Sequence, residues 1–570
     1  MLKKFSLAVM FLGVAILISS CASAGKNRAT QSALLNNLQG GKYEAALNTV
    51  NAPDFYSKKD ANGNETSNSA LLGYLERGTV LYLSGNYEQA LETFNLAQQT
   101  SDDLFTKSIS KKVAAAVGSS SVDNYYGSRY ERSLIRFYQA LVNYNLSQKA
   151  TTPDAKTEHL RQARANITEW SSLLDSYKTE LAGKVTFKTD LAQNLFGAFI
   201  HEQFGTSEDR QIALNLYPTA KNVLFQNYNL YPSFNDKYVL FNKDFKKLST
   251  MNLAKVESDY VGKTSNQTDL EAFIDARLAK LQSNNKDNVF VVVKDDFVAP
   301  KIAKKVIVGF IAGNNRPIDI KAEDTFIPVP VDFLIALGGQ DFYDFLNTTF
   351  KLGAYSLPTI EFEIPYVAQN KSRHYTAELV GQNETINVPL ALADPISDFA
   401  ANENELDFAA ITPIAVKAVT LHTAALYASY QIYKKATANL GNSIADKTKK
   451  KVALTAFGAA YVVATKAINS TLQADLRYWS TLPNSIRFAS AKVADGAYTL
   501  NIYDDTNDGV KNLVYKQKVE VKGDTLVDIN TNMKAPVELL PAIPQGAVKP
   551  LALPRNAIDT IKKAAAAGSK

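Results

Sequence analysis

Residues 70–97 read ALLGYLERGTVLYLSGNYEQALETFNLA, and this stretch decides the fold of the N-terminal half. Gly85-Asn86 is a turn signal between two apolar-periodic segments of helical length. The small side chains of Gly78 and Ala90 would let two antiparallel helices approach closely, and Phe94 would fill the space between neighbouring hairpins. The stretch therefore predicts a helical hairpin.

The hairpin pattern is repeated along the chain. The heptapeptide GKYEAAL at 41–47 returns as GNYEQAL at 85–91, 44 residues later. Looser versions follow at 130–146 with 158–174, and at 190–204 with 207–224. Seven residues of the best copy have the spacing of the tetratricopeptide (TPR) signature, and we expect them to pack the repeat: Tyr74, Gly78, Leu81, Tyr87, Ala90, Phe94 and Ala97. We expect a TPR-like helical domain over residues 21–285. A non-repeating helical bundle is the alternative.

The hydrophobic period changes from helical to alternating after residue 285. Short β-branched runs such as VFVVV at 289–293, alternation such as TIEFEI at 359–364, and frequent prolines predict a β-rich domain over residues 288–395. One helix is expected inside this domain, near residues 331–349.

Helical and then alternating patterns return in the C-terminal part. Two alanine-rich segments around a GNS turn predict an α-helical hairpin over residues 405–475. The apolar run at 452–465 is too short to span a membrane, which needs about 20 residues, so we expect a buried helix packed on the β structure. Alternation predicts a small antiparallel β domain at 485–533. The Pro-, Ala- and Lys-rich residues 536–570 predict a flexible tail.

Composition and charge are those of an ordinary globular chain. Hydrophobic residues make up 46% of the 570 residues. The formal net charge is +6, and it falls to +4 when Lys3 and Lys4 are removed with a leader peptide. Spread over the chain, this charge does not indicate a nucleic-acid partner, which would need a concentrated basic face. The predicted fold class is α+β multidomain, in which TPR-like helical hairpins precede a β-rich domain, an α-helical hairpin and a small antiparallel β-sheet.

The first residues predict a signal peptide at 1–20. Lys3-Lys4 is followed by the apolar run 5–18 and by small residues. Ile18-Ser19-Ser20-Cys21 resembles the bacterial lipobox, which implies lipidation of Cys21 and cleavage before it. Cys21 is also the one cysteine of the chain, and an ordinary secretory signal with a stray cysteine is the alternative. Residue 22 is Ala and not the Asp of inner-membrane retention, which favours the outer membrane, facing the periplasm.

Patterns of catalytic chemistry are weak in this sequence. His159 and His201 lie in predicted helices without a metal-ligating residue three or four positions later. The sequence contains no P-loop, dinucleotide fingerprint or G-x-S-x-G serine. The segment DDTNDG at 504–509 begins like a calcium loop, but Tyr515 stands where a bidentate Glu is required, so a hairpin turn is favoured. We predict no catalytic, cofactor-binding or metal-ligating residue.

Three residues after the C-terminal hairpin are candidate site residues. We expect Asp475 and Arg477 to form a charge-assisted pair that ties the long helix to the β domain. Trp479, followed by Leu482-Pro483, would plug this joint with apolar surface. A ligand site at the same joint is the alternative.

Three motifs in order carry a family resemblance. They are Tyr126-Gly127 with Tyr130-Glu131-Arg132 leading into the run 138–144, Ile364-Pro365-Tyr366, and the run ADLRYWSTLP at 474–483 followed by GAYTL at 496–500. Together they resemble a poorly characterised family of bacterial TPR-like envelope lipoproteins, over most of the mature chain. Well-matched members carry arginines in the helix corresponding to 412–433, and this chain lacks them. The resemblance implies an envelope lipoprotein, with genes in some bacteria near those for lipoprotein activators of penicillin-binding proteins. It implies no reaction.

These observations favour a non-enzymatic scaffold or adaptor in cell-envelope assembly or maintenance. TPR-like hairpins make a concave surface suited to holding a partner protein. We expect envelope proteins of unknown identity as partners, a membrane contact through the lipid anchor, no nucleic acid and no cofactor. A role in peptidoglycan synthesis rests on the resemblance alone. The first alternative is an outer-membrane lipoprotein that binds a glycan or nutrient. Such proteins usually carry acidic residues shortly after the lipidated Cys and several Trp for stacking on sugars, whereas this chain has two Trp and no acidic residue before Glu44. The second is an envelope hydrolase with dispersed catalytic residues.

Overall fold

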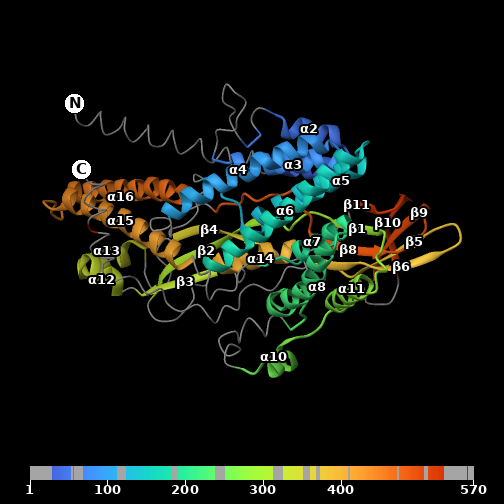
Figure 1. The fold of residues 1–570 in the computed structure, drawn as a ribbon. Helices are drawn as coiled ribbons and strands as arrows, with labels where there is room; N and C mark the ends of the chain where they lie inside the picture. The colour runs from blue at the N-terminus through green and yellow to red at the C-terminus, as the bar shows by residue number, and fades with distance from the viewer. Residues whose placement is uncertain are drawn as a thin grey trace.

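The computed structural model describes most of the chain between residues 29 and 531. The described residues are 29–52, 55–56, 68–111, 124–180, 187, 189–237, 251–311, 325–330, 332–350, 360–367, 373–407, 411–471, 474–505, 511–531 and 562. The predicted signal peptide, Cys21 and all of the predicted tail except Lys562 lie outside them. The protein is a mixed α+β chain built from several modules (Figure 1).

The N-terminal half is a layer of helices. Residues 29–39 are helical, and the following helices are α2 (Tyr43–Val50), α3 (Ala70–Leu83), α4 (Tyr87–Lys111), α5 (Arg129–Lys149), α6 (Pro153–Glu180), α7 (Leu191–Phe204), α8 (Ser207–Asn227), η1 (Tyr228–Leu230), α10 (Leu253–Tyr260) and α11 (Ser265–Gln282). Consecutive helices pack as the pairs α3–α4, α5–α6 and α7–α8. Gly85 and Gly205 turn the chain inside two of these pairs at φ +80° and +67°, a conformation that glycine adopts readily.

Gly78 is the point of closest approach within the first pair. A Cβ placed on Gly78 would lie 2.7 Å from Cε1 of Phe94, so the ring packs directly on the glycine backbone. Six of the seven predicted repeat-packing residues are buried, and Tyr87 packs partly buried against the same core.

We expect Gly78→Leu to destabilise the helical layer. The leucine side chain would displace Phe94, and overpacking of this kind typically costs about 1–3 kcal/mol. Gly458→Leu is the matched control, because a Cβ at this helical glycine would meet nothing within 4 Å. Thermal unfolding followed by circular dichroism measures both. Equal melting temperatures for the two variants would contradict the close packing at Gly78.

Two four-stranded sheets form a sandwich beside the helices. The inner sheet has the order β11-β1-β8-β7 and the outer sheet the order β10-β9-β5-β6. Their bounds are β1 (Val289–Asp295), β5 (Tyr375–Val380), β6 (Thr385–Pro389), β7 (Ala391–Asp394), β8 (Ser485–Ala491), β9 (Gly496–Asp505), β10 (Lys511–Val521) and β11 (Thr525–Thr531). Val291 of β1 and Leu500 of β9 share the core between the sheets. Phe290, one residue earlier, stacks on Phe199 of α7 at 3.9 Å between ring centroids. The inner sheet is therefore covered on both faces.

This arrangement corrects the division into domains expected from the sequence. Strands from 288–395 and from 485–533 pair within both sheets, for example β1 with β8 and β5 with β9. They are one β structure, and not a β-rich domain followed by a separate small one. Local alternation identifies a strand and its buried face, but it does not specify a partner strand more than 100 residues away.

The remaining strands belong to a third module with the C-terminal helical hairpin. The sheet β3-β2-β4 shares a core with four helices. The elements are β2 (Lys301–Ile311), β3 (Thr325–Pro330), α12 (Asp332–Gly338), α13 (Gln340–Phe350), β4 (Ile360–Val367), α15 (Ile411–Thr437) and α16 (Ile444–Thr471). The single helix expected near 331–349 is two helices, because the chain turns at Gly339 with φ +79°. This module lies at the opposite end of the molecule from β9 and β10 (Figure 1). A further helix, α14 (Ile396–Asp407), follows β7.

Helix α16 is less covered than its composition suggests. Phe457 and Tyr461 are buried in the shared core, as expected. Val452 and Val462 are 64% and 50% exposed, so the expectation of a buried helix is wrong for the opposite face. Across the described residues, no helix combines the length and hydropathy required to cross a membrane.

Candidate functional site at the helix–sheet joint

The segment that links α16 to β8 crosses the helical layer, and Trp479 is its anchor. The Trp479 side chain is fully buried and lies 5.5 Å from Tyr138 of α5 and 6.1 Å from Phe94 of α4, between ring centroids. Its Nε1 donates to Oγ1 of Thr79 on α3 at 2.9 Å. Trp479 therefore plugs the helical layer, whereas the sequence placed the plug between the long helix and the β domain.

Glu76 of α3 holds the residues directly after the tryptophan. Its Oε1 accepts hydrogen bonds from the backbone N (2.8 Å) and Oγ (2.7 Å) of Ser480. Its Oε2 accepts from the backbone N (3.1 Å) and Oγ1 (2.6 Å) of Thr481. Burial raises the pKa of Glu76 to about 7, and the four hydrogen bonds oppose this rise. Sequence reasoning missed Glu76, although a glutamate inside the apolar run LLGYLERGTVLYL is itself a signal of a buried acceptor.

Glu131 of α5 holds the same segment from the neighbouring helix pair. It accepts from the backbone N of Trp479 at 2.7 Å and from the hydroxyl of Tyr125 at 2.6 Å. It also accepts from the backbone N of Ser128 and so completes a capping box at the start of α5. Two buried carboxylates on different helices thus bind consecutive residues of one linker. Glu131 lies in a motif that carries the family resemblance, but its role as an acceptor was not anticipated.

Asp475 and Arg477 form the expected pair but contact a different element. Nη2 and Nε of Arg477 donate to the two oxygens of Asp475 at 2.7 and 2.8 Å. The remaining Nη1 donates to the carbonyl of Asn68 and to Oγ of Ser69, immediately before α3. The pair therefore ties the linker to the start of α3. We expected it to tie the long helix to the β domain.

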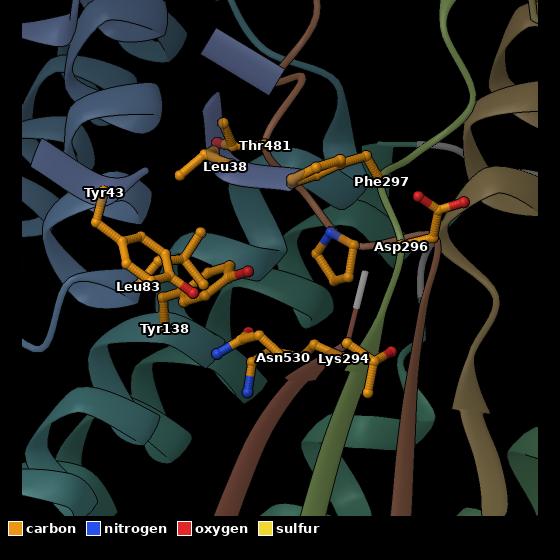
Figure 2. Close-up of a pocket in the computed structure, with 11 residues that line it drawn as sticks. Leu38, Tyr43, Leu83, Tyr138, Lys294, Asp296, Phe297, Thr481 and Asn530 are labelled. Atoms are coloured by element: carbon orange, nitrogen blue, oxygen red, sulfur yellow. The ribbon is translucent and has the colours of Figure 1, made fainter. Parts of the chain in front are cut away.

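A small cavity lies beside this joint (Figure 2). Tyr138 and Thr481 line it together with side chains from α2, α3, β1 and the end of β11. It leaves ≈ 20 Å³ for the centre of a water-sized sphere, which is room for about one water molecule and far less than a sugar needs. The cavity in this conformation does not provide the ligand site considered as the alternative role of the joint.

The cavity wall contains a buried lysine whose charge is neutralised locally. Lys294 of β1 pairs with Asp528 of β11, and burial lowers the pKa of Lys294. Asp528 also accepts from the hydroxyl of Tyr82 on α3 and from Nδ2 of Asn145 on α5. The cluster fastens the inner sheet to two helices, which is a structural role.

A second buried pair of carboxyls, Asp190 and Asp394, joins the helices to β7. Oδ1 of Asp394 accepts from the hydroxyl of Tyr228 at 2.9 Å and from the backbone N of Ala192 at 3.3 Å. Its Oδ2 is buried and receives no donor from the described residues. Asp190 caps the start of α7 by accepting from the backbone N of Gln193. Burial raises the pKa of Asp190 to about 6 and that of Asp394 as well. A side-chain hydrogen bond between Asp190 and Asp394 contributes to both shifts, and two carboxyls can form one only when they hold a proton between them.

Each of the four histidines lies beside a polar side chain. His201 Nδ1 lies 2.6 Å from Asp209 and His374 Nε2 lies 2.6 Å from Asp269. His422 faces Asn469 and His159 faces Asn143. Within the part of the chain that the structure describes, no group of three or more His, Cys, Asp or Glu side chains is arranged to hold a metal ion.

The linker and the inner sheet together cover part of the helical layer. The linker lies on α3 and α5 through Glu76 and Glu131, and the inner sheet lies on α7 through Phe199 and Phe290. Comparison of the chain with protein-family models, with curated proteins and with solved structures gave no match. The fold and the joint define an α+β multidomain protein whose C-terminal segment closes on its own helical layer.

Proposed function

We propose that the protein is a lipid-anchored lipoprotein of the cell envelope that acts as a non-enzymatic scaffold or adaptor. The observation that carries the proposal is the joint itself. Glu76, Glu131 and Trp479 fasten the C-terminal linker to two helix pairs, and the inner sheet packs on a third. Helices, sandwich and linker are thereby fastened to one another, which suits a protein that positions others at a membrane.

The helix pairs support a TPR-like assignment in their packing. Gly78 lies against Phe94, and Ala90 and Ala97 are fully buried, as the close packing of paired helices in such repeats requires. In this protein the first helices of the pairs face the chain's own linker and sheet. We therefore place the partner surface on the outward faces of the second helices α4, α6 and α8, which expose residues such as Glu92 and Ala165.

The anchoring part of the proposal rests on the lipobox-like residues 18–21. We expect Cys21→Ser to abolish incorporation of a clickable fatty acid and to release the protein from the membrane fraction. The reason is that the thioether cannot form on a serine hydroxyl. Metabolic labelling of cells that produce each form measures this. Full labelling of the serine variant would show that Cys21 is not the lipidated residue.

The adaptor part is tested by photo-crosslinking in living cells with the full-length chain. A crosslinking amino acid at Ala165, on the outward face of α6, should capture a discrete protein adduct. The same amino acid at exposed Lys518 of β10 is the control and should capture none. If positions along α4, α6 and α8 all fail while the protein is membrane-bound, the helical layer is not the partner surface. Turnover in an activity-based probe panel would contradict a non-enzymatic role.

A further inference from the structure

The α15–α16 hairpin carries the whole net charge of the chain. Residues 411–471 contain eight lysines, no arginine, no glutamate and one aspartate, Asp446, which gives a formal charge of +7. The complete chain has +6, so the remaining residues together sum to −1. The nearly neutral average considered in the sequence analysis therefore conceals one strongly basic element at one end of the molecule (Figure 1).

The outer half of this hairpin, residues 432–452, is largely exposed and combines lysines with aliphatic side chains. Five of its lysines are exposed: Lys434, Lys435, Lys447, Lys449 and Lys451. Among them lie Ile432, Ile444 and Val452, which are 55%, 86% and 64% exposed. Aliphatic side chains so exposed in the midst of positive charge are characteristic of surfaces that bind anionic lipid.

An apolar stripe continues along α16 from this tip. Between Lys451 and Lys466 the sequence has no charged residue. At about 100° per residue, Val452, Ala456, Ala459 and Val463 fall on one face. Val452 and Val463 of this face are 64% and 38% exposed, whereas Phe457 on the other side packs on Phe345 of α13 at 5.1 Å between ring centroids. The helix therefore has one face in the core and one apolar face in solvent.

We propose that the outer half of the α15–α16 hairpin docks on the surface of an anionic phospholipid bilayer. The lysines would contact headgroup phosphates, and Ile444 and Val452 would enter the boundary with the acyl chains. Nucleic acid fits less well, because its recognition relies on arginine and on exposed aromatic rings for stacking, and this surface offers lysine and aliphatic groups. A second copy of the chain would bring like charges together.

Given the proposed lipidation of Cys21, the lipid and the hairpin can share one bilayer when α16 lies along the membrane surface, because its 28 residues place the tip about 42 Å from its base. Nε2 of Gln31 lies 3.5 Å from the carbonyl of Tyr478, which is seven residues after the end of α16 at Thr471. Cys21 precedes Gln31 by ten residues, a reach of at most about 35 Å. The lipid anchor and the hairpin would then be two separate attachments of the protein to one membrane surface.

The test uses the full chain carrying Cys21→Ser, so that it holds no lipid and the outcome is independent of anchoring. Flotation with vesicles of phosphatidylcholine containing a quarter of phosphatidylglycerol should recover the protein, and vesicles of phosphatidylcholine alone should not. Binding should fall steeply between about 0.1 and 0.5 M salt. Lys435→Gln, Lys447→Gln, Lys449→Gln and Lys451→Gln together should weaken it about 100-fold or more. Ile444→Ser with Val452→Ser should weaken it without changing the charge.

The matched control neutralises four exposed lysines at the other end of the molecule: Lys511, Lys516, Lys518 and Lys522, each changed to Gln. It removes the same charge and should leave vesicle binding within about twofold of the parent chain. Equal loss in the control, or no binding to anionic vesicles, would overturn the proposal. Binding to an oligonucleotide that exceeds vesicle binding, or a dimer abolished by Val452→Ser with no vesicle binding, would overturn it in favour of those partners.

Discussion

Replacing Glu76 with glutamine should be among the most destabilising single changes in the protein, at about 3–4 kcal/mol. Both carboxylate oxygens accept two hydrogen bonds each from Ser480 and Thr481 in a fully buried site. A glutamine side chain has one acceptor oxygen, and its NH₂ group would face one backbone N–H and one hydroxyl, of which only the hydroxyl can turn to accept. The backbone N–H would lose its partner without access to water, at about 1–3 kcal/mol, and the hydrogen bonds to the remaining oxygen would no longer be made to a charged group.

Urea unfolding at constant pH gives the free energy of unfolding for this comparison. Glu92→Gln is the matched control, because Glu92 is exposed on α4 and the same chemical change there should alter stability by less than about 0.5 kcal/mol. The fluorescence of Trp479 should also change in the Glu76 variant, since the linker is no longer held. Equal unfolding midpoints for the two variants would show that the joint does not depend on Glu76.

The second large effect is a dependence of stability on pH that Asp394→Asn should reduce. Burial raises the folded-state pKa of Asp190 from 3.8 to about 6, and it raises those of Asp394 and Glu76 in the same direction. Between pH 4 and 6 the folded state therefore binds more protons than the unfolded state. Stability is highest at the acidic end of this window and falls as the pH rises through about 6. Because Asp190 and Asp394 titrate together, this dependence belongs to the pair and not to either residue alone.

In the Asp394→Asn variant, the side-chain amide permanently provides the hydrogen-bond donor that the shared proton provides in the parent protein. The asparagine Oδ1 can accept from Tyr228 and Ala192 as the carboxylate does, and Nδ2 can donate toward Asp190. We expect the variant to lose the part of the decline that Asp394 contributes, while Asp190 and Glu76 still titrate, and to be more stable than the parent at pH 8. Asp103→Asn, at an exposed position of α4, should reproduce the parent curve. Parallel curves for all three proteins would exclude the shared proton.

The sequence by itself determined most of the elements and many of their buried faces. Gly85-Asn86 and the small residues Gly78 and Ala90 indicated the first helix pair, since helical periodicity and turn chemistry are local properties. The alternation in 359–364 likewise indicated β4, whose burial follows the same period. The expectation of one helix at 331–349 was wrong only in number, because Gly339 divides the segment into α12 and α13.

Only the tertiary structure decided which elements meet. The pairing of β1 with β11 and with β8 unites two segments that local patterns could not connect. The partners of Glu76 are about 400 residues away, and a buried glutamate gives no sign in the sequence of which donors it will receive. Asp475, Arg477 and Trp479 could be singled out by residue type, but their direction, toward α3 and α5 and not the sandwich, depended on packing. The exposure of one face of α16 could not be predicted for the same reason. Composition shows how apolar a helix is, but the elements packed around it decide how much of that surface is exposed to water.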